Sequence, residues 1–418
     1  MELNPRSRDI IQNLIQKGVD IPNPLTLDIG KEVDVSRISG NGVKIFPGCR
    51  IYGEKTLIAR DVRIGYEGPV TIENCQIGPG VELKGGFFKE SVFLEKSSMG
   101  LGAHVREGCL LEEQARGAHC VALKQTILFP FVTIGSLVNF CDCLMAGGRG
   151  PRNHSEVGSS YIHFNFTPDG DKATPSLIGD VPRGVMVNQP PIFLGGQGGM
   201  VGPLRLGYGN VVAAGTILRN DSVEDNKFIV GKSYKGLVTD YTPYQYTSLS
   251  RVVRNNMFYL ANLVALEQWY KYVRKLFFTR DATGTMLYEG AMEKLYMAKK
   301  ERTARLKAMA EKMPASLKNH PARGQAAARK KEFQQKASGV CDMFLSDLID
   351  TAQVKELREN FLSQLEAHMP SSNADYLVVI QTLPDSASMA GTRWLQQVVD
   401  ELCRRVDSTF PSMRLFKI

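Results

Sequence analysis

The 418-residue chain lacks the features that mark membrane, secreted and zinc-binding proteins. No apolar run approaches the roughly 18 residues of a membrane-spanning helix, so none is expected. The first residues, MELNPRSRDIIQNLIQKG, mix acidic, basic and amide side chains without the apolar stretch of a secretory signal. The eight cysteines form no CxxC pair, and Cys141 and Cys143 are too close for a usual zinc spacing. These absences predict a cytoplasmic protein with free, buried thiols.

Acidic residues are scarce in one segment of the chain. The composition is otherwise ordinary, with 43% hydrophobic and 22% charged residues and a net charge of +8. Residues 299–331 contain eleven Lys or Arg but only two acids, Glu301 and Glu311. Such a segment indicates either an anionic partner or a solvated pair of helices with surplus lysine. No aromatic residues are interleaved with the basic ones, which argues against a nucleic-acid partner.

Aliphatic residues recur every six positions in the first half of the chain. The repeat is seen in Ile45, Ile51 and Leu57; in Ile58, Ile64 and Val70; in Ile77 and Leu83; and in Met99, Val105 and Leu111. A period of six fits neither a helix nor a hairpin strand, and it is typical of a hexapeptide-repeat parallel β-helix. Three hexads would close one coil of about 18 residues, so residues 18 apart should lie about 4.8 Å apart in adjacent coils.

The repeat divides the chain into three predicted parts. Residues 1–27 should form a helical cap over the open first coil, with an amphipathic helix ending near Gly18. Residues 28–240 should form the β-helix, interrupted by the glycine-rich segments 146–153 and 194–200. Loops that project from solenoid corners commonly carry function.

The remaining residues, 241–418, should form a mainly α-helical C-terminal domain. An apolar stripe that includes Leu260 and Phe277 predicts a helix of about 25 residues. Further helices are expected near 285–313, 325–350, 352–368 and 392–408, and one strand is expected at Leu377–Gln381. No motif in this part indicates a particular chemistry.

Spacing of 18 selects Arg106, Lys124 and Asp142 as a stack on three successive coils. Two stacked cations are unfavourable unless an anion lies beside them, so the spacing predicts either a phosphate site or a charge ladder closed by Asp142. A second cluster lies in the segment 156–172, where His163 and Asn165 alternate with Ile162 and Phe164. Both polar side chains should therefore point to one side of a strand, as a general base and a substrate anchor would. The alternative is a passive, hydrogen-bonded histidine.

This region resembles the acetyltransferase half of the bifunctional UDP-N-acetylglucosamine pyrophosphorylase / glucosamine-1-phosphate acetyltransferase family. The segment VGSSYIHFNFTPDGDKATPSLIGD is similar to the family's loop of the form IGAGT…NYDG…IGD, with Thr167 and Pro168 as an insertion. The family's LRPG is matched by Val105-Arg106-Glu-Gly108, its lysine by Lys124, and its IAAGT by residues 212–216. The similarity extends over about residues 40–220 and implies a left-handed β-helix, a homotrimer and sites in the grooves between subunits.

The resemblance implies roles for individual residues. Arg106, Lys124, Asn139 and Asn165 would bind a sugar nucleotide or sugar phosphate, and the 18-residue spacing adds Asp142 to this set. Ala213 and Ala214 would line the groove for acetyl-CoA or another acyl-CoA, with no metal at the site.

The departures from the family also matter. Its catalytic histidine falls on Ser136, a poor base, so His163 or His154 would have to replace it, and the family's tyrosine falls on Asn139. No glycine-rich nucleotide loop opens an N-terminal αβ domain, so the pyrophosphorylase half is not seen.

Two functions therefore stand as hypotheses. The first is an acyltransferase that acts on a sugar nucleotide or sugar phosphate with an acyl-CoA. The second is a non-catalytic β-helix that binds a sugar nucleotide or scaffolds an assembly. Carbonic anhydrase chemistry of the γ class would need three zinc-binding histidines, and the histidines at 104, 119, 154 and 163 do not form the expected spaced pair.

Overall fold

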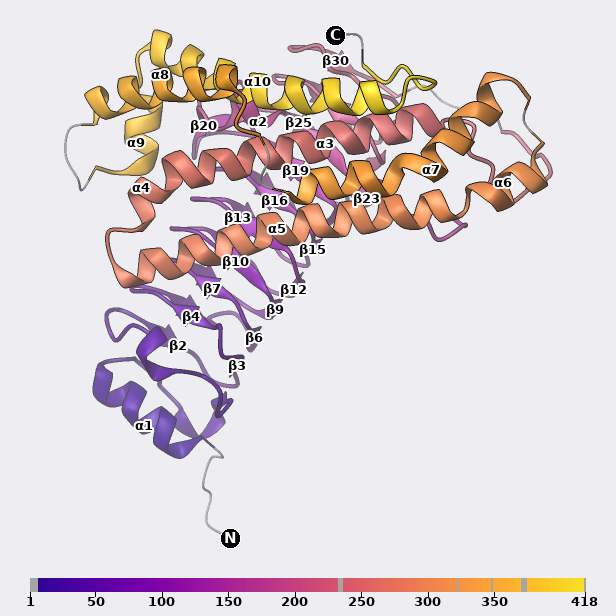
Figure 1. Cartoon of the computed structure of the whole chain (residues 1–418). Coiled ribbons are helices and arrows are strands. Elements are labelled where there is room, and N and C mark those ends of the chain that lie inside the picture. The colour runs from indigo at the N-terminus through magenta and orange to yellow at the C-terminus, as the bar shows by residue number, and fades with distance from the viewer. Residues whose placement is uncertain (1–6, 232–235, 322, 347–348, 370–373, 417–418) are drawn as a thin grey trace.

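The computed structural model is a parallel β-helix that passes into a layer of long helices (Figure 1). The structure describes residues 7–231, 236–321, 323–346, 349–369 and 374–416. The β-helix has three sheets of stacked parallel strands, here called faces A, B and C. Each coil of the chain contributes one short strand to each face in turn, so every strand pairs with the strands one coil before and after it.

Faces A and B have ten strands each and face C has eight. Face A comprises β2 (Lys44–Ile45), β5 (Arg63–Ile64), β8 (Glu82–Leu83), β11 (Ser98–Met99), β14 (Arg116–Gly117), β17 (Thr133–Ile134), β22 (Glu156–Val157), β25 (Phe193–Leu194), β28 (Val211–Val212) and β30 (Phe228–Ile229). Face B comprises β1 (Asp28–Ile29), β3 (Arg50–Tyr52), β6 (Val70–Glu73), β9 (Gly86–Lys89), β12 (Ala103–Val105), β15 (Ala122–Lys124), β18 (Asn139–Cys141), β23 (Ile162–Phe164), β26 (Gly199–Val201) and β29 (Ile217–Leu218). Face C comprises β4 (Leu57–Ile58), β7 (Gln76–Ile77), β10 (Ser91–Phe93), β13 (Cys109–Leu111), β16 (Ile127–Leu128), β19 (Cys143–Met145), β24 (Ser176–Ile178) and β27 (Arg205–Leu206).

The six-residue period marks the side chains that fill the interior of the β-helix. Ile45, Ile51 and Ile58 are fully buried, and each begins a column that continues in the next coil, as where Ile64 pairs with Ile45. Alternate residues on each short strand point outward, which explains why one aliphatic residue per hexad is sufficient. The predicted parallel β-helix is confirmed.

The N-terminal helix α1 (Arg8–Lys17) covers the first coil. Its residues Ile11 and Leu14 are buried, and the helix ends at Gly18, which adopts φ 106° in the left-handed region that favours glycine. The Ser7 hydroxyl accepts a hydrogen bond from the Ile29 backbone N–H at 3.0 Å and fixes the helix to β1. The predicted end near Gly18 is confirmed, whereas residues 1–6 of the predicted cap lie outside the described residues. Two short 3-10 turns, η1 (Pro24–Thr26) and η2 (Val35–Arg37), follow.

The first glycine-rich interruption forms an antiparallel hairpin of β20 (Gly148–Gly150) and β21 (Asn153–His154), between face C and face A. The chain then continues through the one-turn helix α2 (Val181–Gly184) and the last coils. The second interruption joins β25 to β26 and stays within the coil.

The helical part begins with α3 (Leu249–Trp269), which continues through a π-helical turn, η3 (Tyr270–Arg274), into α4 (Lys275–Phe278). The other helices are α5 (Ala282–Glu311), α6 (Met313–Asn319), α7 (Gln325–Leu345), α8 (Ala352–His368), α9 (Tyr376–Gln381) and α10 (Asp385–Thr409). Helix α5 lies across β7, β10 and β13, and α3 lies against β24, so the helices cover face C (Figure 1). No helix in the described ranges combines the length and apolar character that a membrane span requires.

The predicted strand at Leu377–Gln381 is wrong, because this segment is helix α9. Asp375 caps the helix by accepting a hydrogen bond from the Val378 backbone N–H at 2.9 Å. Leu377 and Ile380 are buried while Val378 is 59% exposed, a helical rather than an alternating pattern. The β-branched composition misled the prediction, since tertiary packing overrides propensity in so short a segment.

Candidate functional site

Face B carries Lys124 and Asn139 on its strands, and Arg106, Ala213 and Ala214 lie at its edges. It is bounded by two corners: the A–B corner, where the chain passes from face A to face B, and the B–C corner, where it passes from face B to face C. A shallow groove of about 630 Å³ crosses the lower coils of this face, lined in part by Arg50, Phe87 and His104. A ligand on face B would therefore lie away from the helices, which cover face C.

Arg106 and Lys124 lie one above the other at the B–C corner. Val105 pairs with Leu123, and the Arg106 backbone N–H donates to the Leu123 carbonyl at 2.9 Å, so the next residues are in register. Asp142 does not continue this stack, because Lys124 pairs with Cys141 rather than with Asp142. The coil is one residue shorter here than the 18-residue rule assumes. The predicted three-residue ladder is therefore wrong in its last member.

Glu107, rather than Asp142, neutralises Lys124. The two side chains form an ion pair and are about two-thirds buried, at 28% and 32% side-chain exposure. Partial burial alone would raise the pKa of Glu107, but the hydrogen bond and charge of Lys124 outweigh it and hold the pKa below its usual value. Arg106 is exposed at the surface beside this pair. The B–C corner thus presents two cations: Arg106, which is exposed, and Lys124, which forms a partly exposed ion pair with Glu107.

Asp142 and Asn165 are instead engaged by the helical domain. Arg302 of α5 donates to Asp142 Oδ1 at 2.6 Å, and Asn165 donates from Nδ2 to Asp142 Oδ2 at 3.0 Å. The side chains of Arg302 and Asp142 are only 2% and 6% exposed. Arg302 also donates to the Lys172 carbonyl at 3.0 Å, within the loop that follows Asn165. Both residues that were predicted to bind substrate therefore form a buried junction between the two parts of the chain.

His163 is inside the β-helix. Its strand neighbour Ile162 pairs with Asn139, so the His163 ring lies in the interior column between Phe140 and Met200. It is 2% exposed, and its Nε2 lies 2.8 Å from Ser176 Oγ. Burial in this apolar column, together with the charge of Arg302, lowers the pKa of His163 to about 4. Alternation along the strand was predicted correctly, but the side to which His163 points is the core, where no substrate reaches it.

His154 lies on the hairpin between face C and face A. Its Nδ1 is 2.8 Å from the Pro151 carbonyl, and its Nε2 is 3.8 Å from Glu156. It does not stack on Ser136, because Thr133 pairs with Glu156 and brings Ser159, not His154, above Ser136. The inserted hairpin lengthens this coil and removes the predicted 18-residue relation.

A different histidine, His119, contacts Ser136. Thr133 pairs with Arg116, so residue 119 lies directly below residue 136 at the A–B corner. His119 Nδ1 and Ser136 Oγ are 2.9 Å apart, and the imidazole is exposed. This pair was missed from the sequence because coils of 18 residues were assumed. His119 and Ser136 are 17 residues apart, so a coil shorter by one residue would have placed them together.

Ala213 and Ala214 lie on the same A–B corner, in a higher coil between β28 and β29. The corner needs small residues for a structural reason: a Cβ on Gly195 would lie 2.3 Å from the Ala214 backbone nitrogen of the next coil. Ala214 itself is exposed. Asn139 is also exposed, and its Oδ1 lies 3.2 Å from the Cys141 thiol, from which it accepts a hydrogen bond. Both residues are therefore accessible from solvent.

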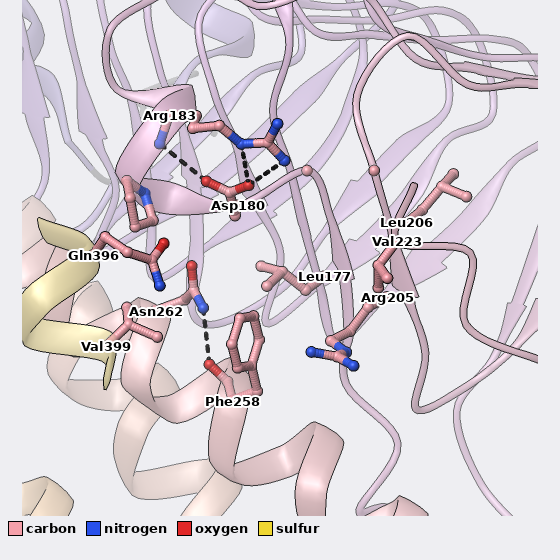
Figure 2. A pocket seen from close by; sticks show the side chains of 13 residues that line it. Leu177, Asp180, Arg183, Arg205, Leu206, Val223, Phe258, Asn262, Gln396 and Val399 are labelled. Atoms are coloured by element: carbon pink, nitrogen blue, oxygen red, sulfur yellow. Dashed lines mark hydrogen bonds and ion pairs between the residues drawn. The ribbon is translucent and has the colours of Figure 1, made fainter. Parts of the chain in front are cut away.

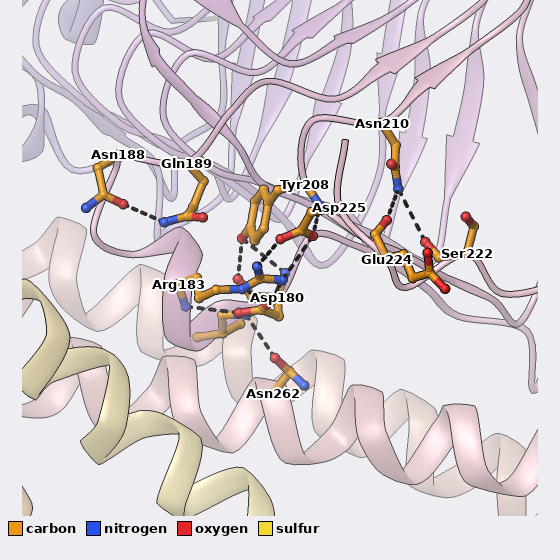
Figure 3. A network of polar contacts seen from close by, with 11 residues as sticks. Asp180, Arg183, Asn188, Gln189, Tyr208, Asn210, Ser222, Glu224, Asp225 and Asn262 are labelled. Atoms are coloured by element: carbon orange, nitrogen blue, oxygen red, sulfur yellow. Dashed lines mark hydrogen bonds and ion pairs between the residues drawn. The ribbon is translucent and has the colours of Figure 1, made fainter. Parts of the chain in front are cut away.

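A cavity of about 170 Å³ lies between the upper coils and helices α3 and α10, and Figure 2 shows Asn262, Gln396 and Val399 projecting toward it from those helices. Its charged groups are paired within the protein. Arg183 contacts Asp180 at 2.7 Å and Asp225 at 2.5 Å, and its guanidinium lies 4.7 Å from the centre of the Tyr208 ring. Figure 3 shows this network joining α2 to neighbouring coils. We therefore assign the cavity to the contact between the β-helix and the helical domain.

Several cations of the basic segment 299–331 also pair with acids elsewhere in the molecule, either within the helical part, as with Glu267 of α3, or on the β-helix. Lys299 pairs with Glu267 at 2.7 Å and Lys312 pairs with Asp171 at 2.8 Å, in addition to the Arg302–Asp142 pair. Part of the surplus positive charge is therefore neutralised inside the molecule. Within the described ranges, no group of three or more His, Cys, Asp or Glu side chains is arranged to hold a metal ion.

Comparison with known proteins identifies relatives for about half of the chain. It is 28% identical over 212 residues to the "Bifunctional protein GlmU" of Thermotoga maritima, covering 50% of this chain and 42% of that protein. It is 26% identical over 224 residues to the protein of the same name from Synechococcus elongatus, covering 54% and 44%. The corresponding protein of Pelobacter propionicus is 28% identical over 215 residues, covering 51% and 41%.

The chain thus spans less than half the length of these curated relatives. No family model matches the chain. The similarity confirms the resemblance drawn above from the residues of the β-helix.

Proposed function

We propose that this protein is an acyltransferase, which moves the acyl group of acetyl-CoA or another acyl-CoA to a sugar nucleotide or sugar phosphate on face B. One observation carries the proposal: a stacked Arg106–Lys124 pair and a His119–Ser136 pair stand at opposite corners of this face, one strand apart. Lys124 follows His119 by five residues, of which the last three are strand β15 and the first two complete a turn, so the two corners are separated by no more than roughly 16 Å. The resemblance to the bifunctional enzymes supports the same reaction class.

In this proposal Arg106 and Lys124 bind the substrate phosphate with charge-assisted hydrogen bonds. The exposed carboxamide of Asn139 lies between the two corners and can contact the sugar. The pantetheine arm of the acyl-CoA would follow the A–B corner past Ala213 and Ala214, about three coils, or roughly 14 Å, above Ser136. Asp142 and Asn165 support the B–C corner through Arg302 instead of contacting the ligand.

His119 would serve as the general base. If its Nδ1–H donates to Ser136 Oγ, the neutral imidazole keeps a free lone pair on Nε2. The acceptor's amine or hydroxyl attacks the thioester carbonyl and loses its proton to Nε2. The C–S bond then breaks, and the departing thiolate receives that proton and leaves as free CoA thiol. In the family the catalytic histidine occupies the position of Ser136. In this chain Ser136 would instead hold His119 in position as the base.

The grooves of a homotrimer would complete the site, as in the resembling family. The outward side chains of face A support this view, because they change from polar to apolar along the β-helix. Lys44 and Arg63 stand on the first coils, whereas Val211 and Phe228 are 41% and 72% exposed on the last ones. Exposed apolar columns of this kind are typical of surfaces that pack against another chain.

The alternative is a non-catalytic protein that binds a sugar nucleotide. The observation that favours it is that Asp142 and Asn165 are engaged in the contact with Arg302 and are therefore not available to bind a substrate. Both functions require Arg106, but only catalysis requires His119.

The test is an assay of acyl transfer from acetyl-CoA to a panel of amino- and hydroxyl-sugar phosphates and nucleotides. The reaction is measured by the amount of free CoA thiol that it releases. Removing a general base should lower turnover by roughly 10²–10⁴-fold in His119→Ala, with binding of UDP-N-acetylglucosamine unchanged. Ser136→His in the His119→Ala background should restore part of the rate. Arg106→Ala should weaken ligand binding, while Arg116→Ala, which removes an exposed arginine from face A, is the control. Wild-type turnover in His119→Ala would refute its role, and failure of CoA to bind would refute acyl transfer.

A further inference from the structure

A cleft of about 480 Å³ lies at the end of the helical domain where α3 and α7 begin and α6 ends, near the labels of α6 and α7 in Figure 1. It is separate from face B. Its lining includes His320, Arg329 and Lys330, and among the described residues none of those that line it is an aspartate or glutamate. A cleft with basic groups and no acid attracts anions.

Lys330 is the least exposed of these basic residues, at 7%. Its Nζ donates to Ser316 Oγ at 2.8 Å, and within the described ranges no carboxylate lies at ion-pair distance from it. This distinguishes it from Lys299 and Lys312, which have Glu267 and Asp171 as partners. Burial lowers the pKa of Lys330, as expected for an ammonium group that has lost water without gaining a counter-charge. Such a group is costly to bury unless an anion joins it.

Two helix N-termini open into the same cleft. Helix α3 has 21 residues, no acidic residue in its first turn and no side-chain hydrogen bond from its N-cap, Ser248. Helix α7 also has 21 residues, no acid in its first turn and Gly324 as its N-cap. Their first-turn N–H groups are therefore left for other acceptors, and the helix dipoles favour negative charge there. In the first turn of α3, the Ser250 hydroxyl is buried and has no hydrogen-bond partner in the described part of the chain.

We propose that this cleft binds the phosphate group of a phosphorylated small molecule, with Lys330 as the counter-charge and the first turns of α3 and α7 as hydrogen-bond donors. Arg329 and His320 stand at the rim, where Arg329 donates from Nε to the Ser412 carbonyl at 3.2 Å. Within the described part of the chain, the terminal nitrogens of Arg329 make no hydrogen bond, so they can donate to a ligand. The volume lies within the range of about 300–1,000 Å³ that small-molecule sites occupy. The site goes beyond the proposed function and does not depend on it.

The cleft is also connected to the B–C corner. Tyr246 lines it and donates to Asp171 Oδ2 at 2.7 Å, in the loop that follows Asn165. Lys312 holds the same carboxylate through its other oxygen, at 2.8 Å. A ligand that orders Tyr246 would therefore also stabilise the loop beside face B.

The test is calorimetry on the full chain with pyrophosphate, with a nucleoside diphosphate and with CoA. Lys330→Met keeps the length of the side chain and removes its charge, so it should weaken binding of the phosphate ligands at least about tenfold. Lys318→Met removes an exposed lysine that does not line the cleft and should leave the affinity unchanged. Arg329→Gln, a change at the rim, should weaken binding less and serves if Lys330→Met does not fold.

The source of the phosphate follows from the three ligands. If the nucleotide or CoA binds more tightly than pyrophosphate, the natural ligand is an organic phosphate. If all three bind equally, the ligand is inorganic phosphate or pyrophosphate. Either result supports the site. No binding of any of the three, or equal losses in Lys318→Met and Lys330→Met, would overturn it. Arg106→Ala removes the phosphate site proposed on face B. Phosphate binding that persists in this variant and is lost in Lys330→Met therefore belongs to the cleft, whereas binding that is lost only in Arg106→Ala belongs to face B and would overturn the site.

Discussion

The Arg302–Asp142 contact should be one of the strongest single links between the β-helix and the helical domain. Replacing Arg302 by Met would leave the Asp142 carboxylate buried, with the hydrogen bond from Asn165 at 3.0 Å as its remaining side-chain contact. Breaking a buried ion pair from one side costs about 3–5 kcal/mol, because the other charge stays desolvated without a partner. We therefore expect Arg302→Met to lower the free energy of unfolding by this amount, measured by denaturant unfolding of the full chain.

A double-mutant cycle separates the pair from the packing of the arginine stem. Asp142→Asn removes the charge but keeps an acceptor. The loss in free energy of unfolding of Asp142→Asn/Arg302→Met should therefore be smaller than the sum of the two single losses, by about 2 kcal/mol or more. Arg305→Met is the matched control on the same helix: its partner Glu301 lies at 2.8 Å, but its side chain is 36% exposed, so the loss should stay below about 1 kcal/mol. Equal losses in Arg302→Met and Arg305→Met, or strictly additive effects in the cycle, would refute the reasoning.

Two further predictions concern buried titratable groups. His163 has a pKa lowered to about 4, so the folded state resists its protonation; stability should fall as the pH drops from about 6.5 toward 4, by about 2 kcal/mol at about pH 5, and His163→Met should remove this dependence in unfolding measurements. Burial raises the pKa of Glu112, although the charge of Arg274 opposes the shift. The contribution of Glu112 to stability is therefore fully present at low pH, where the carboxyl is protonated in both states, and it is lost as the pH rises above the usual pKa of a glutamate. Glu112→Gln keeps an acceptor for Tyr270 and should therefore gain stability relative to the wild type at about pH 8 but not at about pH 5; the opposite sign would contradict a raised pKa.

The hexad repeat was sufficient to predict the β-helix, because its period directly reflects the geometry of a three-sided coil. It also predicted the Arg106–Lys124 stack, since the coil between them has 18 residues. Lys124 and Cys141 are only 17 apart, and the shortening occurs at the corner after Lys124, where Leu111 already pairs with Leu128. A loss of one residue at a corner leaves the aliphatic pattern intact while shifting every later spacing, so the predicted position of Asp142 was wrong by one.

The direction of His163 could not be read from alternation alone. Alternation tells which residues share a side of a strand, but not which side faces the core. Ile162 and Phe164 of β23, and Phe166 just after it, are 42%, 42% and 67% exposed, so the apolar residues of this segment lie outside and the histidine lies inside. The usual assignment of apolar residues to the core fails where an outer face carries apolar side chains of its own.

The partners of the helical domain were beyond sequence reasoning for a similar reason. Arg302 follows Asp142 by 160 residues, and nothing in their local sequence relates them. The basic segment was recognised as unusual, yet part of its charge serves acids on the β-helix and in α3, a pairing that only the fold brings about.

These contacts divide the B–C corner into two halves with different capacity for ligands. In the upper half, Asp142 and Arg302 are almost completely buried, and separating them would leave two desolvated charges. In the lower half, Lys124 and Glu107 are about one-third exposed, and a pair of this kind contributes no more than about 1 kcal/mol. A phosphate beside Arg106 can therefore displace Glu107 from Lys124 at small cost, whereas no ligand of ordinary affinity can displace Arg302. The anion binding proposed for this corner would therefore involve Arg106 and Lys124 and leave the Arg302–Asp142 pair intact.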